Sequence, residues 1–246
     1  MKKTWPVIHL QSVDSTNNYA NKLLIENRVS EEFVIAANFQ ENGKGQPGNS
    51  WHSEKNKNLL FSLVLFTDFV PVNKQFFLSQ AISLGIVDFL KDNNIQSSMK
   101  WPNDIIAENK KIAGILIENS VMNNSLLHSI IGIGLNVNQT DFEKELSDAI
   151  SMKNITSEDY SLHDKLNSLL IFLKYRIKLL KEKRFERLRT DYLQNIYKIR
   201  EQQLFIASNK IFKGFITDVE PSGELVILSE EVKKLKFLFK EIQFID

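Results

Sequence analysis

The segment 43–51 (Gly-Lys-Gly-Gln-Pro-Gly-Asn-Ser-Trp) constrains this chain most, because three glycines and one cation fall within its first six residues. Glycine permits tight turns and close backbone approach, and successive amide N–H groups in such turns bind anions. Residues 32–39 and 59–66, on either side, are short apolar runs typical of strands. We therefore expect a loop that joins two strands and serves a site, the alternative being a mobile connection without a ligand.

Two known glycine-rich patterns do not fit this segment. The spacing Gly-x-Gly-x-x-Gly matches the dinucleotide fingerprint, but that fingerprint requires a helix directly after the last glycine. Residues 49–58 are mostly polar and show no apolar repeat at helical spacing. The protein-kinase glycine loop occurs with His-Arg-Asp and Asp-Phe-Gly motifs, which are absent from the sequence.

Composition excludes several classes of protein. A chain of 246 residues can form one large core, or a core with a small second domain. With 31 Lys and Arg against 30 Asp and Glu, it has no strong basic field for nucleic acid. Its longest apolar runs are far below the roughly twenty residues of a membrane span, so we expect a soluble protein and a cytoplasmic location.

Metal and thiol chemistry are also limited by composition. The sequence has no cysteine, which excludes disulfides, a thiol nucleophile and a thiolate metal site. The four histidines, His9, His52, His128 and His163, lack metal-ligand spacing.

Hydrophobic periodicity predicts two domains, residues 1–200 and 201–246. In the first domain we expect strands at 5–11, 32–39, 59–66, 96–101, 111–118 and 126–137, and helices at about 15–26, 74–91 (capped by Asn73), 162–180 and 185–199. After residue 200 the pattern changes to short strands at 203–207, 211–219, 224–228 and 235–240.

Further segments carry polar side chains that suit a site. They are residues 14–17 (Asp-Ser-Thr-Asn), Gln40, residues 100–104 (Lys-Trp-Pro-Asn-Asp), residues 111–116 (Lys-Ile-Ala-Gly-Ile-Leu) and residues 132–136 (Gly-Ile-Gly-Leu-Asn). Each alone is equally explained by structure, as a helix cap, a turn or a solvated strand edge. Together and in this order, with the glycine-rich segment, the set resembles the catalytic domain of biotin–protein ligases, also called biotin–[acetyl-CoA-carboxylase] ligases.

This resemblance implies an α+β fold, with a mixed sheet flanked by helices, similar to class II aminoacyl-tRNA synthetases. A small C-terminal β-barrel is expected to follow. The motifs cover about residues 8–138. Since the catalytic domain would start almost at Met1, we expect the monofunctional type, without the N-terminal DNA-binding domain of the repressor members and without DNA as a partner.

The resemblance also implies a reaction in two steps. Biotin and ATP form biotinyl-5′-adenylate and pyrophosphate, and a lysine of a biotin carboxyl carrier protein or domain of a biotin-dependent carboxylase then takes the biotin. Lys111 and Lys44 are the implied catalytic cations, and Asp104 is the implied Mg²⁺ ligand. The implied biotin contacts are Ser15, Thr16, Asn17, Gln40, Gly43, Lys44, Gly45, Gln46, Lys111, Gly114 and Leu116. The implied ATP contacts are Lys44, Trp51, Lys100, Asn103, Lys111 and Asn136.

The loop departs from the family pattern at three positions. Many members carry arginines where this chain has Lys44 and Gln46, and Pro47 replaces a basic or small residue. Lysine cannot form a bidentate fork to phosphate and glutamine has no charge, so weaker retention of the adenylate is expected unless another cation compensates.

Two other functions stay open on the sequence alone. One is a lipoate–protein ligase of the same fold, and the other is a biotin-binding module without turnover. An exposed sheet edge would also permit a homodimer, although no sequence feature identifies such an edge.

Overall fold

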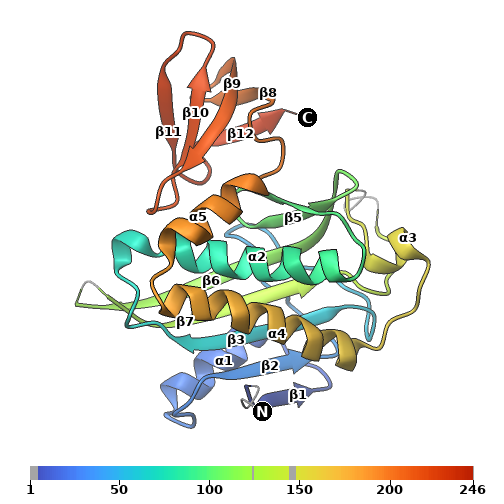
Figure 1. Ribbon diagram of the computed structural model, residues 1–246. Helices are drawn as coiled ribbons and strands as arrows, with labels where there is room; N and C mark the ends of the chain where they lie inside the picture. The colour runs from blue at the N-terminus through green and yellow to red at the C-terminus, as the bar shows by residue number, and fades with distance from the viewer. Residues whose placement is uncertain (1–4, 124, 144–147, 246) are drawn as a thin grey trace.

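The computed structural model describes residues 5–123, 125–143 and 148–245. Within these residues, the first domain contains a seven-stranded sheet in the order β1-β2-β3-β7-β6-β5-β4 (Figure 1). Strands β1 and β2 are parallel and the other neighbours are antiparallel, which makes the sheet mixed. The strands are β1 (Val7–Leu10), β2 (Phe33–Ala37), β3 (Leu59–Phe66), β4 (Ser98–Lys100), β5 (Asp104–Ala107), β6 (Lys110–Met122) and β7 (Ser125–Leu135). The helices are α1 (Thr16–Ile25), α2 (Phe76–Asp92), α3 (Met152–Thr156), α4 (Leu162–Lys181) and α5 (Phe185–Gln194), with a 3₁₀ turn η1 (Val72–Lys74) before α2.

Helices cover both faces of this sheet. Strand β3 is buried along almost its whole length, and its alternate residues enter different cores. Leu63 and Leu65 join the large core beneath α2 and α4, whereas Val64 joins a smaller core with Ala20 and Leu23 of α1. Because successive strand residues point to opposite faces, α1 lies on the face opposite α2 and α4. This explains why β3 is apolar on both faces, apart from Ser62.

The α2 and α4 pair forms the main helical layer, seen across the centre of Figure 1. Helix α2 is apolar nearly all round, as expected for a helix buried between a sheet and another helix. Gly85 permits this packing, because a Cβ there would lie 2.8 Å from the Leu173 side chain of α4. The Arg176 guanidinium also joins α2 to α4 and α5 by pairing with Asp88 and Asp191.

The C-terminal region forms a separate antiparallel sheet in the order β11-β10-β9-β8-β12. Its described strands are β8 (Gln202–Ala207), β9 (Lys210–Val219), β10 (Leu225–Ser229), β11 (Lys234–Phe237) and β12 (Ile242–Ile245). The two edge strands β11 and β12 are linked through a row of rings, in which Phe237 contacts Phe212, Phe212 contacts Phe205, and Phe205 contacts Phe244. The sheet therefore encloses an aromatic core, as in a small barrel, although the strand order leaves β11 and β12 as open edges.

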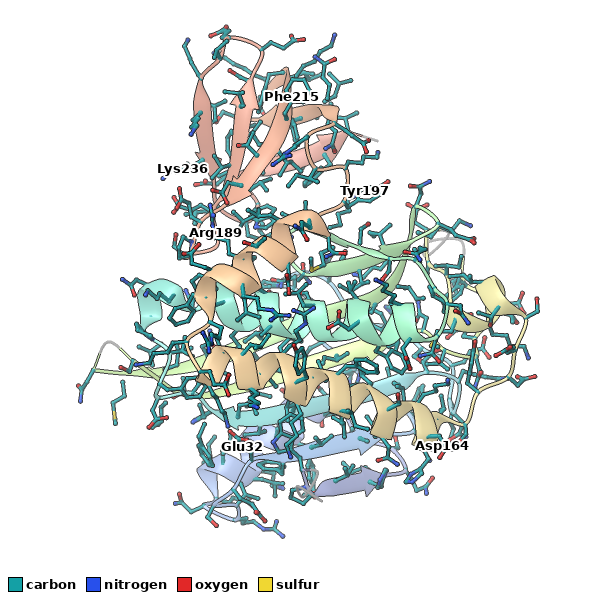
Figure 2. All side chains as sticks on the ribbon, viewed as in Figure 1. Glu32, Asp164, Arg189, Tyr197, Phe215 and Lys236 are labelled. Carbon is teal, nitrogen blue, oxygen red and sulfur yellow. The ribbon has the colours of Figure 1, made fainter. Side chains whose placement is uncertain are left out.

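Polar contacts attach this C-terminal sheet to the first domain. Arg189 of α5 pairs with Asp218 of β9, and the Trp101 Nε1–H donates to the Gly223 carbonyl at 2.9 Å. Figure 2 shows Arg189 on α5 and Lys236 on β11 at the two sides of this boundary. The division into domains at residue 200 stays a prediction, and the start of β8 at Gln202 is consistent with it.

Several sequence expectations on local structure were wrong. Asn73 does not cap α2, because it lies inside η1 and the cap position is Gln75. Helix α5 ends at Gln194 instead of residue 199, since residues 195–197 pair with Met99 of β4 through two backbone hydrogen bonds of 2.8 and 2.9 Å. Four short elements, β5, η1, α3 and β12, were not predicted from the sequence. Among the described helices, none is long and apolar enough to cross a bilayer.

Candidate active site

A polar pocket of about 190 Å³ opens on the α1 face of the sheet. It lies over the middle of β3, β7 and β6, with the N-terminus of α1 on one side and the glycine-rich segment on the other. The lining residues are Ser15, Thr16, Asn17, Gln40, Lys44, Gly45, Gln46, Asn49, Ser50, Trp51, Phe61, Pro102, Asn103, Asp104, Lys111, Gly114, Ile115, Leu116, Gly132, Ile133, Gly134 and Phe239. Residues from both domains therefore meet at one site.

The floor of the pocket is formed by the backbone of glycines in β6 and β7. Gly114 of β6 is paired directly with Gly134 of β7, and the Trp51 ring lies on this pair. A Cβ at Gly134 would lie 2.3 Å from the Trp51 ring, and one at Gly132 would lie 2.5 Å from Asn17 Oδ1. Only glycine leaves room for these side chains, so the spacing of glycines in the two strands determines the shape of the floor.

A lysine and an aspartate face each other at one end of the floor. Lys111 Nζ lies 2.7 Å from Asp104 Oδ1, and both side chains are partly exposed. The backbone of Lys111 is held by residues 148–150, because its N–H donates to Asp148 and its carbonyl accepts from Ile150. Lys111 Nζ also lies 5.6 Å from the centre of the Trp51 ring, within the range of a cation–π contact. The ammonium group is thus fixed beside the glycine-rich segment.

Metal ligands are sparse around this pair. Asp104 is the only carboxylate among the described lining residues, and Asp104 Oδ1 is buried without a hydrogen bond beyond its ion pair. No group of three or more His, Cys, Asp or Glu side chains in the described residues could hold a metal. This arrangement fits Mg²⁺ only if a ligand phosphate supplies most of the oxygens, which is how Mg²⁺ usually binds beside nucleotides.

A chain of hydrogen bonds runs along the opposite wall. Gln40 Oε1 accepts from Thr16 N at 2.8 Å and from Thr16 Oγ1 at 2.9 Å. Ser62 Oγ lies 2.7 Å from Thr16 Oγ1 and 2.6 Å from Asn17 Oδ1, and its single hydrogen can serve one of them at a time. Thr16, Asn17 and Ser62 are all buried. This wall therefore has fixed polar groups, of the kind that orient a small ligand.

The chain continues to the glycine-rich segment through Glu118. Asn17 Nδ2 donates to Glu118 Oε2 at 2.7 Å, and Lys44 Nζ lies 3.3 Å from Glu118 Oε1. Nearby, a hydrogen bond from the Asn18 side chain lowers the pKa of the Asp14 carboxyl, so Asp14 stays ionised at the start of α1. Charged groups therefore link α1, β6 and the segment.

The glycine-rich segment folds back on itself as an irregular hairpin. Lys44 and Ser50 form a bridge, and Trp51 N donates to the Gly43 carbonyl at 2.8 Å. Gly48 has a φ of 95°, which favours glycine. From the second domain, Lys240 Nζ donates to the Pro47 carbonyl at 2.8 Å. The segment is thus held from both domains.

Most of the predicted site residues lie around this single pocket. The ones that line it are Ser15, Thr16, Asn17, Gln40, Lys44, Gly45, Gln46, Trp51, Asn103, Asp104, Lys111, Gly114 and Leu116. Asn103 is additionally locked to β6, since its Nδ2 donates to the Ile115 carbonyl at 2.9 Å.

Three predicted residues lie outside the lining. Gly43 lies at the base of the hairpin opposite Trp51, where a Cβ would be 2.4 Å from the Trp51 carbonyl oxygen. Lys100 is directed toward the rings of Tyr197 and Phe244. Asn136 is buried, and its Nδ2 donates to the Ile150 carbonyl at 3.1 Å. Ligand contact by these three residues stays a prediction.

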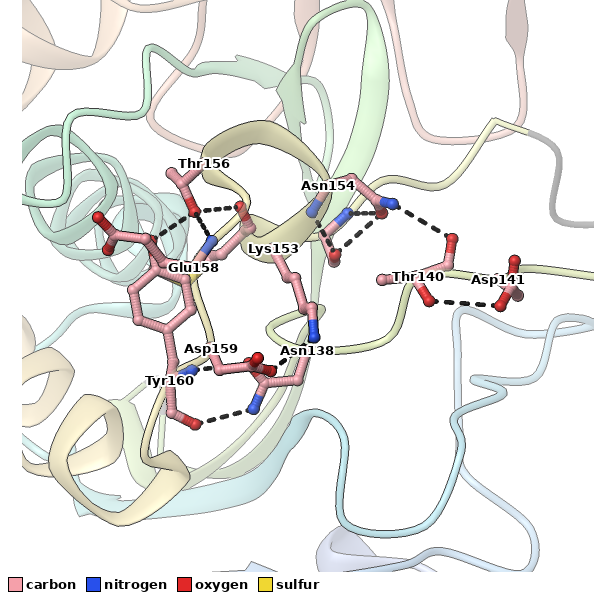
Figure 3. Close-up of polar contacts among 11 residues, drawn as sticks. Asn138, Thr140, Asp141, Lys153, Asn154, Thr156, Glu158, Asp159 and Tyr160 are labelled. Carbon is pink, nitrogen blue, oxygen red and sulfur yellow. Dashed lines mark hydrogen bonds and ion pairs between the residues drawn. The ribbon is translucent and has the colours of Figure 1, made fainter.

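Polar contacts also hold the chain that follows Asn136. The side chain of Asn138 exchanges two hydrogen bonds with the backbone of Tyr160, and Asn154 Nδ2 donates to the Thr140 carbonyl (Figure 3). Lys153 pairs with Asp159 at 2.6 Å in the same cluster. This cluster holds the chain that follows Asn136 against residues 153–160.

Phe61 and Phe239 in the lining, and Ser62 and Glu118 beside it, belong to no motif predicted from the sequence. Ser62 lies in the apolar strand β3, and Glu118 lies in β6, which has a mixed sequence. Strand pairing, with Ser62 opposite Gly132 and Glu118 opposite Ile130, places both side chains on the α1 face. Phe239 belongs to the second domain and contacts the Trp101 ring edge-on at 6.5 Å between centroids. For Ser62, the one available sequence signal was that it interrupts a run of large apolar side chains.

Comparison with known proteins identifies relatives of this chain. Residues 9–136 match the model of the biotin/lipoate A/B protein ligase family. The bifunctional ligase/repressor BirA of Bacillus subtilis is 32% identical over 174 residues, which cover 69% of this chain and 53% of the relative. This chain thus spans about half the length of that relative. The biotin–[acetyl-CoA-carboxylase] ligase of Mycobacterium tuberculosis is 30% identical over 126 residues, or 50% of this chain and 45% of the relative.

A solved structure resembles nearly the whole chain. The biotin protein ligase from Aquifex aeolicus in complex with biotin and ATP superposes with a TM-score of 0.79 at 28% identity. The similarity covers 97% of this chain and 98% of that chain, so it includes the C-terminal sheet as well as the pocket.

Proposed function

Because the chain belongs to the biotin/lipoate A/B protein ligase family, we propose that it is a biotin–protein ligase. In the first step, the biotin carboxylate attacks the α-phosphate of ATP, the bond to the β-phosphate breaks, and biotinyl-5′-adenylate and pyrophosphate form. In the second step, the amine of an acceptor lysine attacks the adenylate carbonyl, which releases AMP and a proton. The similarity to a ligase solved with biotin and ATP supports both substrates.

The first step brings two anions together, so it requires cations at the reacting atoms. The observation that carries the proposal is the position of Lys111, which lies beside both Asp104 and the glycine-rich segment in one pocket. A fixed ammonium group offsets the charge that develops on the transferring phosphorus. The amide N–H groups of the segment, and Lys44, whose Nζ pairs with Glu118 at the opposite wall, would add positive potential around the ligand.

The opposite wall suits the ureido ring of biotin. The hydrogen-bond chain through Gln40, Thr16 and Asn17 offers donors and acceptors at fixed positions, while Gly114 and Leu116 border the apolar part. The dithiolane ring of lipoate has no comparable polar groups, so it could not use the hydrogen-bonding capacity that remains on these buried side chains. The polar wall therefore favours biotin over the lipoate alternative.

Mg²⁺ is part of the proposal through Asp104. A bound Mg²⁺ would neutralise charge on the ATP phosphates, and Asp104 would supply one oxygen ligand. The close ion pair of Asp104 with Lys111 means that the same carboxylate also orients the ammonium group.

The second step needs positioning more than chemical assistance, since a phosphate is a good leaving group. The hairpin and Phe239 together cover the pocket, and exclusion of water would protect the adenylate from hydrolysis. The acceptor is proposed to be a lysine of a biotin carboxyl carrier domain. A homodimer and a cytoplasmic location stay predictions, which sedimentation velocity and cell fractionation would test.

The direct test uses the purified protein with biotin, ATP, Mg²⁺ and a carrier domain. We expect the mass of the carrier to increase by one biotinyl group, and no increase when the acceptor lysine is changed to arginine. Pyrophosphate release with biotin, but not with lipoate, would separate the two ligase activities. Biotin binding without pyrophosphate release would instead indicate a binding module.

A further inference from the structure

Glu118 connects the pocket wall to the glycine-rich segment without itself lining the pocket. One carboxylate oxygen accepts from Asn17 Nδ2 at 2.7 Å and the other lies 3.3 Å from Lys44 Nζ. The Glu118 side chain is 42% exposed, whereas Asn17 is 2% exposed. A charged group at the surface thus controls a buried amide.

The chemistry of this contact fixes the orientation of the Asn17 amide. An ionised carboxylate only accepts hydrogen bonds, whereas an amide has one donor end and one acceptor end. Asn17 must therefore turn Nδ2 toward Glu118, and its Oδ1 then faces Ser62 Oγ at 2.6 Å. The second hydrogen of Asn17 Nδ2 has no acceptor among the described residues, and Asn17 lines the pocket.

We propose that Glu118 is a positioning residue that makes Asn17 a hydrogen-bond donor to the ligand and so selects a ligand with a carbonyl acceptor at this point. The inference rests on the proposed function, in which that acceptor is the ureido oxygen of biotin. Gly132 is also needed for this orientation of Asn17, because a Cβ there would lie 2.5 Å from Asn17 Oδ1 and would displace the amide.

The test is Glu118→Gln, which keeps size and shape but adds a donor to the side chain. The glutamine Nε2 can donate to Asn17 Oδ1, so the Asn17 amide is free to turn and present its oxygen to the pocket. Binding of biotin and of 2-thiobiotin is measured by calorimetry without ATP. Both ligands are uncharged at the ring, and the sulfur of 2-thiobiotin is the weaker acceptor. We expect E118Q to reduce the preference for biotin roughly tenfold, the effect of one hydrogen bond.

Two matched variants make the outcome specific. Glu118→Asp keeps an acceptor-only group, so it should retain the preference even if both affinities fall. Glu26→Gln removes a carboxylate of similar exposure, 39%, whose ion pair with Arg28 has the same 3.3 Å distance, at the other end of α1. This control should change neither affinity nor preference.

The inference is overturned if E118Q weakens both ligands by the same factor, since Glu118 would then be only a structural brace. It is also overturned if the preference is unchanged. These results differ from failure of the proposed function, in which the unmodified protein itself would neither bind biotin nor release pyrophosphate.

Discussion

Lys111 and Asp104 form a 2.7 Å ion pair across neighbouring strands, at the end of the pocket where the glycine-rich segment closes over the floor. The pair places one cation and one anion at the point where a carboxylate and a phosphate would meet. Each group has a different expected task, so variants at this pair and around it separate the steps of the reaction.

Lys111→Ala should nearly abolish adenylate formation. Loss of one fixed charge that stabilises the transition state typically costs about 10²- to 10³-fold in rate. Pyrophosphate release with biotin and ATP measures this step. Lys110→Ala is the matched control, because Lys110 is the exposed neighbour on the same strand and does not line the pocket. Turnover near that of the unmodified protein in K111A would refute the assigned role.

Gly134→Ala should impair the site by displacing Trp51. The added Cβ would lie 2.3 Å from the Trp51 ring, and overpacking of this kind costs about 1–3 kcal/mol. We expect the KM for ATP to rise, with the far-UV circular dichroism unchanged. In the double variant G134A/W51A the clash is removed, so the two effects should be less than additive. Additive effects would show that the ring does not rest on this glycine in solution.

Lys240→Met should raise the KM for ATP more than it changes biotin affinity. Lys240 reaches from the second domain to the Pro47 carbonyl, and one such hydrogen bond is worth about 0.5–1.5 kcal/mol. Steady-state kinetics with ATP and calorimetry with biotin give the two values. Lys233→Met removes a lysine just before β11 whose partner is Glu231, and should leave both values unchanged. An equally large loss of biotin affinity would contradict the expectation that Lys240 acts mainly on ATP binding.

Arg176→Met should destabilise the fold without altering the pocket directly. The Arg176 side chain is 10% exposed and joins two carboxylates from α2 and α5. Loss of one partner of a buried pair costs about 3–5 kcal/mol, and the partial exposure of the two aspartates reduces this to about 2–3 kcal/mol. Urea denaturation measures the change. Lys178→Met, which removes an exposed pair on the same helix, should cost less than about 1 kcal/mol.

Stability should fall as pH decreases below neutrality because of His128. Burial lowers the pKa of His128 below its ordinary value of 6.5. Between the folded and unfolded values the unfolded chain therefore binds more protons, so the free energy of unfolding is highest above pH 6.5 and decreases as pH falls. His128→Gln should make the pH dependence shallower in denaturation curves at pH 7.5 and 5.5. An unchanged slope would assign the dependence to other groups.

Long periodic segments were predictable from the sequence. Helix α2, helix α4 and strand β3 carry apolar patterns that persist over many residues, so local pattern and tertiary environment agree. Short elements were not predictable in this way. Strand β5 has four residues after a turn, and residues 195–197 continue the apolar period of α5 yet pair with Met99. In such places the contact partner decides the conformation, and that partner is distant in the sequence.

The site was likewise predictable in part. The motifs predicted the residues on both sides of the pocket, because ordered signatures carry chemistry that spacing alone does not. Side-chain direction was harder to predict. Lys100 belongs to a matching motif, yet its side chain packs against Tyr197 and Phe244. Ser62 and Glu118 are brought to the side chains that line the pocket by strand register, which is a property of pairing between strands and cannot be read from one strand.

The Lys44–Glu118 ion pair is about 40% exposed on both sides, so dissolved ions compete with it. An increase in ionic strength should therefore loosen the hairpin from β6. The affinity for biotin measured in dilute buffer would then exceed the affinity at physiological salt. Measurements over a series of sodium chloride concentrations would show how much of that affinity depends on the Lys44–Glu118 contact.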